Sequence, residues 1–407
     1  MVEDRDKPVV LAVDDTPENL DVVKGLLIPT YRVLVATNGP TALKIAEKQS
    51  PDIVLLDIMM PDMDGYEVCR RLKANPATAA TPVIFLTAKD QTADEAEGFS
   101  MGAADYIHKP VNPPILEARV RTHVALKQSM DELARAKQRM EDELNVGRDI
   151  QLSMLPTDKP DTTEFSVEAT MQAAREVGGD FYDFFPVGPR EYAFCVADVS
   201  DKGVASALFM SVTKALIKAR CREDNSTASV VTWVNDEIAI GNESCMFITL
   251  FIAVLDAVTG QVRYTNAGHN PPYIKRADGS LECIDARHGP MVGAMGGIVY
   301  GEDTLQMARG DTLVLFTDGV TEAMNGGREL YGEGRLEALL AEHSGKGVES
   351  LVHDVLASVR EFAAGAEQSD DITLLAFSYD AEPSRAGTER LEIRLANDIS
   401  AIGDVVN

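Results

Sequence analysis

The feature that most restricts the fold of this chain is a series of short apolar runs that alternate with helix-like segments over residues 8–110. The runs with the length of buried strands are Val9–Val13, Tyr31–Val35, Ile53–Leu56, Val83–Leu86 and Tyr106–Ile107. Apolar residues recur at helical spacing between them, as in 42–47 and 66–72. Strands that alternate with helices form a parallel sheet covered on both faces. The sequence therefore predicts a doubly wound α/β domain with a five-stranded parallel sheet.

Polar side chains stand at the carboxyl ends of these apolar runs. They are Asp14, Asp15, Asp57, Thr87 and Lys109. Because such ends share one edge of a parallel sheet, we expect the five to converge. Clustered carboxylates repel one another unless a cation lies among them, and Mg²⁺ suits an all-oxygen site. Asp57 is the candidate nucleophile for an aspartyl-phosphate, with Lys109 and the Thr87 hydroxyl placed to contact the phosphoryl group. Any one of the five alone would be an ordinary polar residue at a loop edge.

Residues 8–125 resemble the receiver domains of response regulators, because all five positions match and the segments MPDMDG and KP are intact. The resemblance implies phosphotransfer from a sensor histidine kinase to Asp57. It also implies a receiver Mg²⁺ held by Asp14, Asp15, Asp57 and the backbone of Met59. Tyr106 stands at the family's aromatic switch position and would reorient together with Thr87. The alternative for Tyr106 is a half-buried strand aromatic.

A long helix is predicted from Pro113 to about Leu155. After Pro114 the sequence has no proline before Pro156 and no glycine before Gly147. Apolar residues recur near heptad spacing at Leu126, Met130, Leu133, Met140 and Leu144. Lys137 and Gly147 interrupt this seam. The segment 113–155, which overlaps the last receiver helix, is therefore either an imperfect coiled coil that joins two copies in a homodimer or a solvated linker helix.

The second half of the chain, from Phe165 to Tyr379, is rich in strand-like runs with interspersed helices. The expected strands include Tyr192–Val199, Phe247–Asp256, Gly260–Ala267 and Thr312–Thr317, and the expected helices include Ala205–Arg220 and Val348–Ala363. Strands that are grouped apart from helices favour an α+β domain.

Four acidic motifs are spread across this second half. They are VGGDFYD (Asp180, Asp183), VADVSDKG (Asp198, Asp201), FTDGVTEA (Asp318, Glu322) and QSDDIT (Asp370, Asp371). Single motifs of this kind are common in turns. Several aspartates without histidine or cysteine partners suit Mg²⁺ or Mn²⁺. Two such ions, roughly 3.5–4 Å apart, bind phosphate oxygens and activate water, so that no protein nucleophile is needed.

Residues 160–380 resemble the PPM (protein phosphatase 2C-like) serine/threonine phosphatases, in particular the bacterial branch that controls sigma factors and sporulation. The resemblance is carried by EVGGDFYD, VADVSDKG, MFITLF, NAGHNPP, LFTDGVTEA and SDDITLL, in that order. It implies a sandwich of two antiparallel sheets flanked by helices. It also implies two metal ions, and the groups assigned to them are Asp180, Asp198, the carbonyl of Val199, Asp318, Asp370 and Asp371. Asp198 would bridge the two ions.

Other polar residues near these motifs have open roles. Asp183 and Asp371 are candidates for indirect support of the ligands, and Asp201 is either an added acidic contact or without a role. Arg175 is the candidate for phosphate recognition. His269 either fixes a turn after a strand or donates a proton to the leaving serine oxygen.

Composition limits the partners. The formal net charge of −27 and pI near 4.6 argue against nucleic acid as a partner. The charged N-terminus lacks the apolar core of a secretion signal, and no apolar stretch is long enough for a membrane span, so we expect a cytoplasmic protein. The five cysteines form no CxxC pair.

Residues 389–407 resemble the opening of an anti-sigma kinase domain, which would make the chain truncated there.

The favoured function is a response regulator whose Asp57 phosphorylation controls a phosphatase acting on a phosphorylated anti-sigma factor antagonist. The alternative is an adaptor with a weak or inactive phosphatase-like half that sequesters sigma or anti-sigma partners. A two-metal phosphodiesterase or nuclease is a third reading, but it predicts histidine ligands that the motifs lack.

Overall fold

The computed structural model describes residues 7–88, 99–343 and 347–381. The chain divides into two compact units between Met140 and Glu141. Helix α5 (Pro113–Met154) begins in the first unit and ends in the second. Within the described residues, no helix combines the length and the apolar content that a membrane crossing requires.

The first unit contains a five-stranded parallel sheet in the order β2-β1-β3-β4-β5. Its strands are β1 (Val9–Val13), β2 (Arg32–Ala36), β3 (Ile53–Asp57), β4 (Val83–Ala88) and β5 (Asp105–Lys109). Each predicted strand is present, with bounds that differ by at most two residues. This confirms the predicted doubly wound α/β fold.

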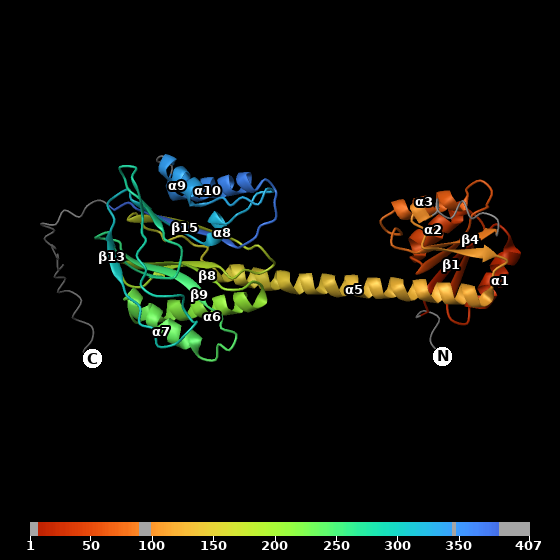
Figure 1. Ribbon diagram of the computed structural model, residues 1–407, viewed down its shortest axis with the longest axis horizontal. Coiled ribbons are helices and arrows are strands. Elements are labelled where there is room, and N and C mark those ends of the chain that lie inside the picture. The colour runs from red at the N-terminus through yellow and green to blue at the C-terminus, as the bar shows by residue number, and fades with distance from the viewer. Residues whose placement is uncertain (1–6, 89–98, 344–346, 382–407) are drawn as a thin grey trace, which may run out of the picture. The chain divides into compact units, whose positions relative to one another are not determined.

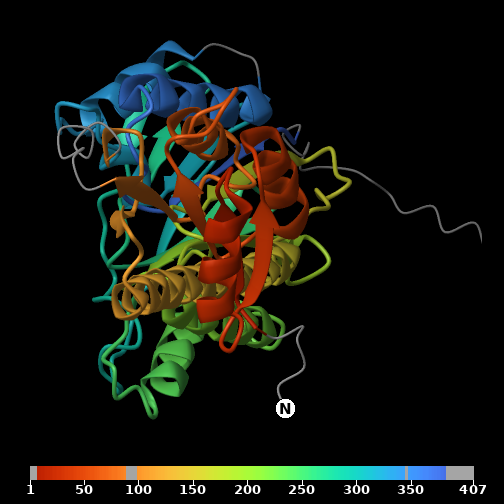
Figure 2. The same ribbon diagram turned by 90° about the vertical axis from the view of Figure 1, so that its right-hand side faces the viewer.

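Helices cover both faces of this sheet (Figure 1, Figure 2). They are α1 (Pro17–Leu27), α2 (Gly39–Gln49), α3 (Gly65–Ala74) and the first part of α5. Because successive side chains of a strand point to opposite faces, Val10 packs with α1 and α5 whereas Leu11 packs with α2 and α3. The side chains of Asn38 and Asp64 accept backbone N–H groups and so cap α2 and α3. This arrangement leaves the carboxyl ends of the strands at one edge.

The second unit is built on two antiparallel sheets of five strands each. One has the order β13-β10-β9-β8-β7, with β7 (Phe181–Pro186), β8 (Glu191–Val199), β9 (Ile248–Asp256), β10 (Gln261–Ala267) and β13 (Asp303–Gln306). The other has the order β12-β11-β14-β15-β6, with β6 (Phe165–Gln172), β11 (Tyr273–Lys275), β12 (Leu281–Cys283), β14 (Thr312–Phe316) and β15 (Ile372–Tyr379).

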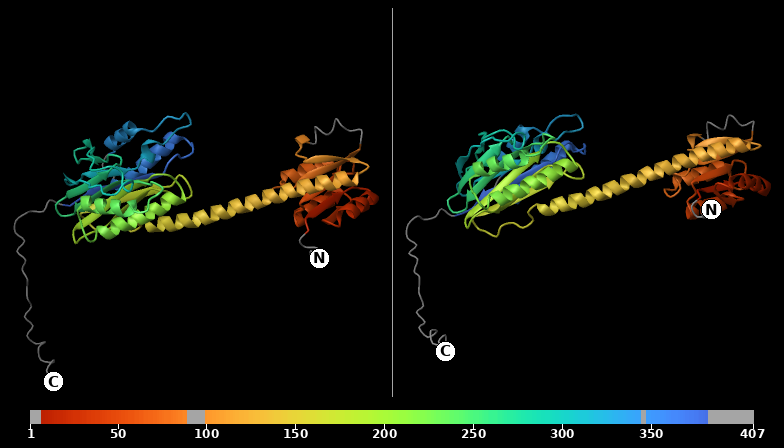
Figure 3. Two further views of the ribbon diagram at one scale, coloured as in Figure 1. Left: turned by 60° about the horizontal axis from the view of Figure 1, so that its bottom comes forward. Right: turned by 90° about the horizontal axis from the view of Figure 1, so that it is seen from below.

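The two sheets pack face to face and helices cover their outer faces (Figure 1, Figure 3). The helices are α6 (Val204–Arg220), α7 (Thr227–Ala239), α8 (Asp318–Thr321), α9 (Glu333–Glu342) and α10 (Gly347–Ala363). Phe194 of β8 stacks on Phe377 of β15 with ring centroids 4.1 Å apart, at the centre of the core between the sheets. A second apolar cluster joins β14 and β15 to α9 and α10. The predicted two-sheet sandwich flanked by helices is confirmed.

Helix α5 has the length that the sequence predicts. It continues through Gly147, since a single glycine costs a helix only about 1 kcal/mol relative to alanine. Leu126, Met130, Leu133 and Met140 are each more than half exposed. The coiled coil and the homodimer stay predictions, and the predicted tail at 389–407 lies outside the described residues.

Candidate functional site

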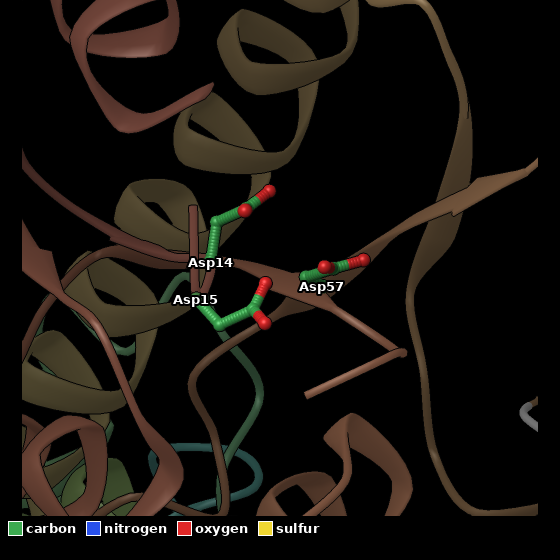
Figure 4. Close-up of side chains that lie close together, drawn as sticks. All are labelled: Asp14, Asp15 and Asp57. Atoms are coloured by element: carbon green, nitrogen blue, oxygen red, sulfur yellow. The ribbon is translucent and has the colours of Figure 1, made fainter. Parts of the chain in front are cut away.

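The receiver carboxylates meet at the edge of the first sheet (Figure 4). Asp14 and Asp15 follow β1 and Asp57 ends β3, so that neighbouring parallel strands bring them together. One oxygen of each carboxylate lies within 4.8 Å of the others. Asp14 and Asp57 are buried whereas Asp15 is exposed. Three carboxylates at this spacing can hold a hard divalent cation.

Lys109 joins this acidic group from the end of β5. Its Nζ lies 2.8 Å from Asp14 Oδ2 and 2.9 Å from Asp57 Oδ1. Burial raises the pKa of Asp57, and hydrogen bonds from Lys109 and from the Met59 backbone oppose this rise. Burial also opposes the charge on Lys109, but its bonds to Asp14 and Asp57 raise its pKa above the ordinary value. Lys109 therefore keeps its charge beside the candidate phosphoacceptor.

Thr87 lies on β4, which pairs with β3, and Tyr106 lies on β5, which pairs with β4 at the edge of the sheet. Thr87 is buried near the end of β4. Tyr106 is also buried, and its ring lies 5.4 Å from the Phe85 ring and 5.0 Å from the Phe99 ring. Tyr106 is thus more enclosed than the half-buried aromatic that was the alternative to a switch.

The acids of the second unit come from four separate segments. Asp180 directly precedes β7, Asp198 lies in β8, Asp318 begins α8, and Asp370 lies in the loop before β15. Asp180 is buried, and the Thr317 hydroxyl donates to its Oδ2 at 2.7 Å. Burial raises the pKa of Asp180, and Asp198 lies close enough for its charge to raise this pKa further.

Crowding among these carboxylates changes their acidity. Burial and the charge of Asp318 raise the pKa of Asp198 to about 7, with Asp370 adding to the effect. Burial and Asp370 raise the pKa of Asp318 to about 6. The pKa of Asp180 is raised as well, by burial and by Asp198. Carboxylates that resist ionisation together, with oxygen atoms alone as donors, fit divalent cations such as Mg²⁺ or Mn²⁺.

The two candidate metal sites nevertheless differ in geometry. Among the described residues, the receiver carboxylates are the one group of three or more acidic, histidine or cysteine side chains whose ligand atoms all lie within 4.8 Å. The acids of the second unit are neighbours without meeting that criterion. A lysine joins this second group as well, with the Nζ of Lys202 2.9 Å from Asp370 Oδ1.

The Asp371 carboxylate binds backbone N–H groups of the glycine-containing loop before Asp180, so its oxygens are already occupied. Its Oδ1 accepts the N–H of Ala174 at 2.7 Å and its Oδ2 accepts the N–H of Gly179 at 2.6 Å. A Cβ on Gly178 would lie 2.6 Å from Asp371 Oδ2, so a side chain there would disturb the contact. Both carboxylate oxygens are engaged, which favours a positioning role for Asp371 over the predicted direct binding of a metal.

The same loop brings the backbone of Val199 to Asp180. A Cβ on Gly179 would lie 3.1 Å from the Val199 carbonyl oxygen, which shows how closely the two segments approach. The predicted carbonyl ligand therefore lies beside the residue before Asp180.

The end of helix α5 also holds this loop. Gln151, which is buried, donates through Nε2 to the Gly178 carbonyl at 2.6 Å and accepts the Gly178 N–H through Oε1 at 3.1 Å. The two bonds fix the peptide groups just before Asp180. Sequence reasoning missed Gln151, since a lone glutamine near a helix end gives no signal of its partner.

Three other candidate residues, Asp183, Asp201 and Arg175, lie outside the acidic group. Asp183 is buried in an ion pair with Lys214 of α6, and Lys218 lies 3.5 Å from it. Asp201 and Arg175 are exposed, and Asp201 has a φ of 66°. The structure therefore brings none of the three to the acidic group by a contact.

Lys214 was another residue that sequence reasoning missed. It shares the buried face of α6 with Met210 and Ile217, and this helical spacing of a lysine among apolar residues was the available signal.

His269 is fully buried, and its Nδ1 lies 2.8 Å from the Thr249 hydroxyl. Burial lowers its pKa to about 4. A neutral imidazole in this position cannot supply a proton near neutral pH. The geometry therefore favours the structural role that the sequence left open.

The two folds and their acidic groups define the class of the chain as a receiver domain joined to a phosphatase domain of the PPM type. Residues 10–121 match the family model described as the response regulator receiver domain, and residues 188–380 match the one described as stage II sporulation protein E. The chain therefore contains a response regulator receiver domain followed by a phosphatase domain of the stage II sporulation protein E type.

Known proteins share parts of this organisation. The chain is 32% identical over 262 residues to protein IcfG of Synechocystis sp., and the aligned region covers 58% of this chain and 41% of that protein. It is 44% identical over 143 residues to a probable cyclic di-GMP phosphodiesterase of Vibrio cholerae, and this aligned region covers 35% of this chain and 32% of that protein. The chain thus spans less than half the length of these relatives. The solved SiaA-PP2C domain of Pseudomonas aeruginosa is similar in fold, with a TM-score of 0.54 and 22% identity over 61% of this chain and 100% of that domain.

Proposed function

We propose that phosphorylation of Asp57 in the receiver domain (8–125) controls a metal-dependent phosphoserine/phosphothreonine phosphatase in the domain at 160–380. Segment 113–155 would link the two. The observation that carries the proposal is the coexistence of two oxygen-donor acidic groups. In the receiver group, a charged lysine contacts the candidate phosphoacceptor. In the phosphatase group, several carboxylates have raised pKa values.

In the receiver, Asp14, Asp15, Asp57 and the Met59 backbone would hold Mg²⁺. Asp57 supplies the nucleophilic oxygen that bonds to phosphorus while the bond from phosphorus to the histidine nitrogen of the kinase breaks. Lys109 remains charged and compensates the added negative charge.

In the phosphatase domain, Asp180, Asp198 and the Val199 carbonyl would hold one ion, and Asp198, Asp318 and Asp370 the other. Two bound Mg²⁺ or Mn²⁺ ions supply charge neutralisation and an activated water. Thr317 orients Asp180, and Asp371 with Gln151 fixes the loop before it. These contacts hold the candidate ligands in one arrangement.

We further propose that the substrate is a phosphorylated anti-sigma factor antagonist, that the phosphodonor is a sensor histidine kinase, and that the protein is a cytoplasmic homodimer joined along α5. The exposed apolar residues of α5 support the dimer, because a helix rarely leaves such a row in water without a partner. The resemblance of 160–380 to the branch that controls sigma factors supports the substrate.

The test measures phosphate release from a phosphoserine protein with and without Mn²⁺, and with and without acetyl phosphate as a receiver phosphodonor. We expect turnover that needs Mn²⁺, is lost in Asp198→Ala and changes with acetyl phosphate. Asp57→Ala should keep Mn²⁺-dependent turnover but lose the response to acetyl phosphate. Turnover that is absent or independent of metal would favour the adaptor instead.

A further inference from the structure

Lys202 is a basic side chain that reaches into the acidic group of the phosphatase domain. Its Nζ lies 2.9 Å from Asp370 Oδ1 and also donates to the Ser369 carbonyl. Its charge lowers the pKa of Asp318, against the larger effects of burial and Asp370. One ammonium group therefore acts on two of the carboxylates that are candidates to bind the second metal ion.

The backbone around Lys202 presents the side chain at this position. Asp201 has a φ of 66° and Gly203 a φ of 95°, so the chain turns sharply on both sides of Lys202 before α6 begins. The Lys202 side chain remains 32% exposed. The Lys202 side chain thus lies beside Asp370, is presented by a tight loop, and stays accessible to a ligand from solvent.

Two features make a purely structural ion pair an incomplete explanation. A partly exposed pair contributes at most about 1 kcal/mol to stability, so stability alone gives little reason for the strained loop. In addition, the Asp370 carboxylate that Lys202 contacts is itself close enough to Asp318 and Asp198 to raise the pKa of both beyond the effect of burial. A divalent cation at Asp370 would compete with the ammonium group, because like charges repel at this distance.

We propose that Lys202 is the residue that binds the phosphoryl group of the substrate, and that in the metal-free site it occupies Asp370 in place of a cation. This inference rests on the proposed phosphatase function. When a divalent cation takes Asp370, Lys202 is released toward solvent, where its ammonium group meets the dianionic phosphate. Lys202 thereby fills the role for which Arg175, which is exposed, was the candidate from sequence.

The test uses the full chain and the variants Lys202→Met, Lys202→Arg and Lys218→Met. Lys218 is the matched control, since it lies in the same unit, is similarly exposed at 39% and pairs with Asp183 instead. Calorimetry would measure the binding of Mn²⁺ to the metal-free protein, and then of inorganic phosphate to the Mn²⁺-loaded protein.

We expect Lys202→Met to bind Mn²⁺ about three- to fivefold more tightly, which is the factor that a partly exposed ion pair is worth. The same variant should bind phosphate about tenfold more weakly, because a charge-assisted hydrogen bond is lost. Its KM for p-nitrophenyl phosphate should rise by a similar factor with little change in kcat. Lys202→Arg should retain phosphate binding, and Lys218→Met should match the wild type in both measurements.

Two results would overturn the inference. Weaker Mn²⁺ binding by Lys202→Met would mean that Lys202 positions Asp370 for the metal instead of competing with it. Unchanged phosphate binding would remove the proposed contact. Neither binding measurement requires turnover, so a wild-type chain without Mn²⁺-dependent activity would count against the proposed function separately.

Discussion

The buried ion pair between Asp183 and Lys214 gives a prediction whose size can be worked from the structure. The Asp183 side chain is 1% exposed and that of Lys214 is 7% exposed. Lys214→Met would leave the Asp183 carboxylate buried without its main partner, which costs about 3–5 kcal/mol. Lys218 at 3.5 Å and the Phe184 N–H at 2.9 Å still contact Asp183, so we expect the low end, about 3 kcal/mol.

Urea unfolding followed by Trp233 fluorescence measures this cost in the relevant unit, because Trp233 is the single tryptophan of the chain and lies in α7. The double variant Asp183→Leu/Lys214→Met should recover most of the lost stability, since two apolar side chains replace the pair without a stranded charge. It should also keep its Mn²⁺ affinity. A loss below about 1 kcal/mol in Lys214→Met, or a double variant no more stable than the single one, would refute the reasoning. Loss of Mn²⁺ binding in the double variant would show that Asp183 supports the metal ligands, as the sequence suggested.

Three further predictions concern the two acidic groups and the helix between them. Lys109→Met should slow labelling of Asp57 by acetyl phosphate, because it removes the cation beside the phosphoacceptor; equal labelling on a phosphate-affinity gel would contradict this. Since Asp198 and Asp318 have pKa values raised to about 7 and about 6, the folded protein holds protons that the unfolded chain releases above about pH 4. The metal-free phosphatase unit should therefore lose stability, seen as a falling Tm, between about pH 4 and pH 7. Its Mn²⁺ affinity should rise as the folded carboxyls ionise, through about pH 6 to 7; a Tm that rises with pH would count against the crowding of these acids. Gln151→Leu should reduce the change in phosphatase turnover caused by acetyl phosphate, and a full response in this variant would exclude the contact as a route of control.

The fold of the receiver was predictable because each of its strands is marked by a pattern of neighbouring residues in the sequence. Each strand is a short apolar run whose ends are marked by polar residues, as in Val9–Val13. In the second unit, local patterns predicted α6 to within one residue but not the pairing of its strands. β6 pairs with β15, so that Phe165 lies opposite Tyr379, and no local pattern reports a contact across that separation.

The acidic motifs were identified from sequence, but the roles of neighbouring acids within a motif were not separable there. Strand alternation explains part of the difference. Asp183 is an odd number of residues from Asp180, so in extended backbone the two side chains point to opposite faces. Adjacent Asp370 and Asp371, in the loop before β15, also diverge, one toward Lys202 and the other toward the glycine loop.

The sequence predicted helix α5, but only the structure shows which residues its end contacts in the phosphatase domain. The sequence predicts a helix without breakers, and a continuous helix can carry a rotation or shift along its length because its backbone hydrogen bonds resist bending. What the sequence could not supply is the point at which such a shift would act. Gln151 makes hydrogen bonds to both backbone groups of one residue, Gly178, and a rotation of the helix would have to break both bonds or move the loop. Because the next residue donates to Asp371 and the one after is Asp180, moving the loop would alter the position of a candidate metal ligand. Under the proposed control, a shift at the end of α5 would therefore reach a candidate metal ligand through Gln151 and the loop, without a rearrangement of the sheets.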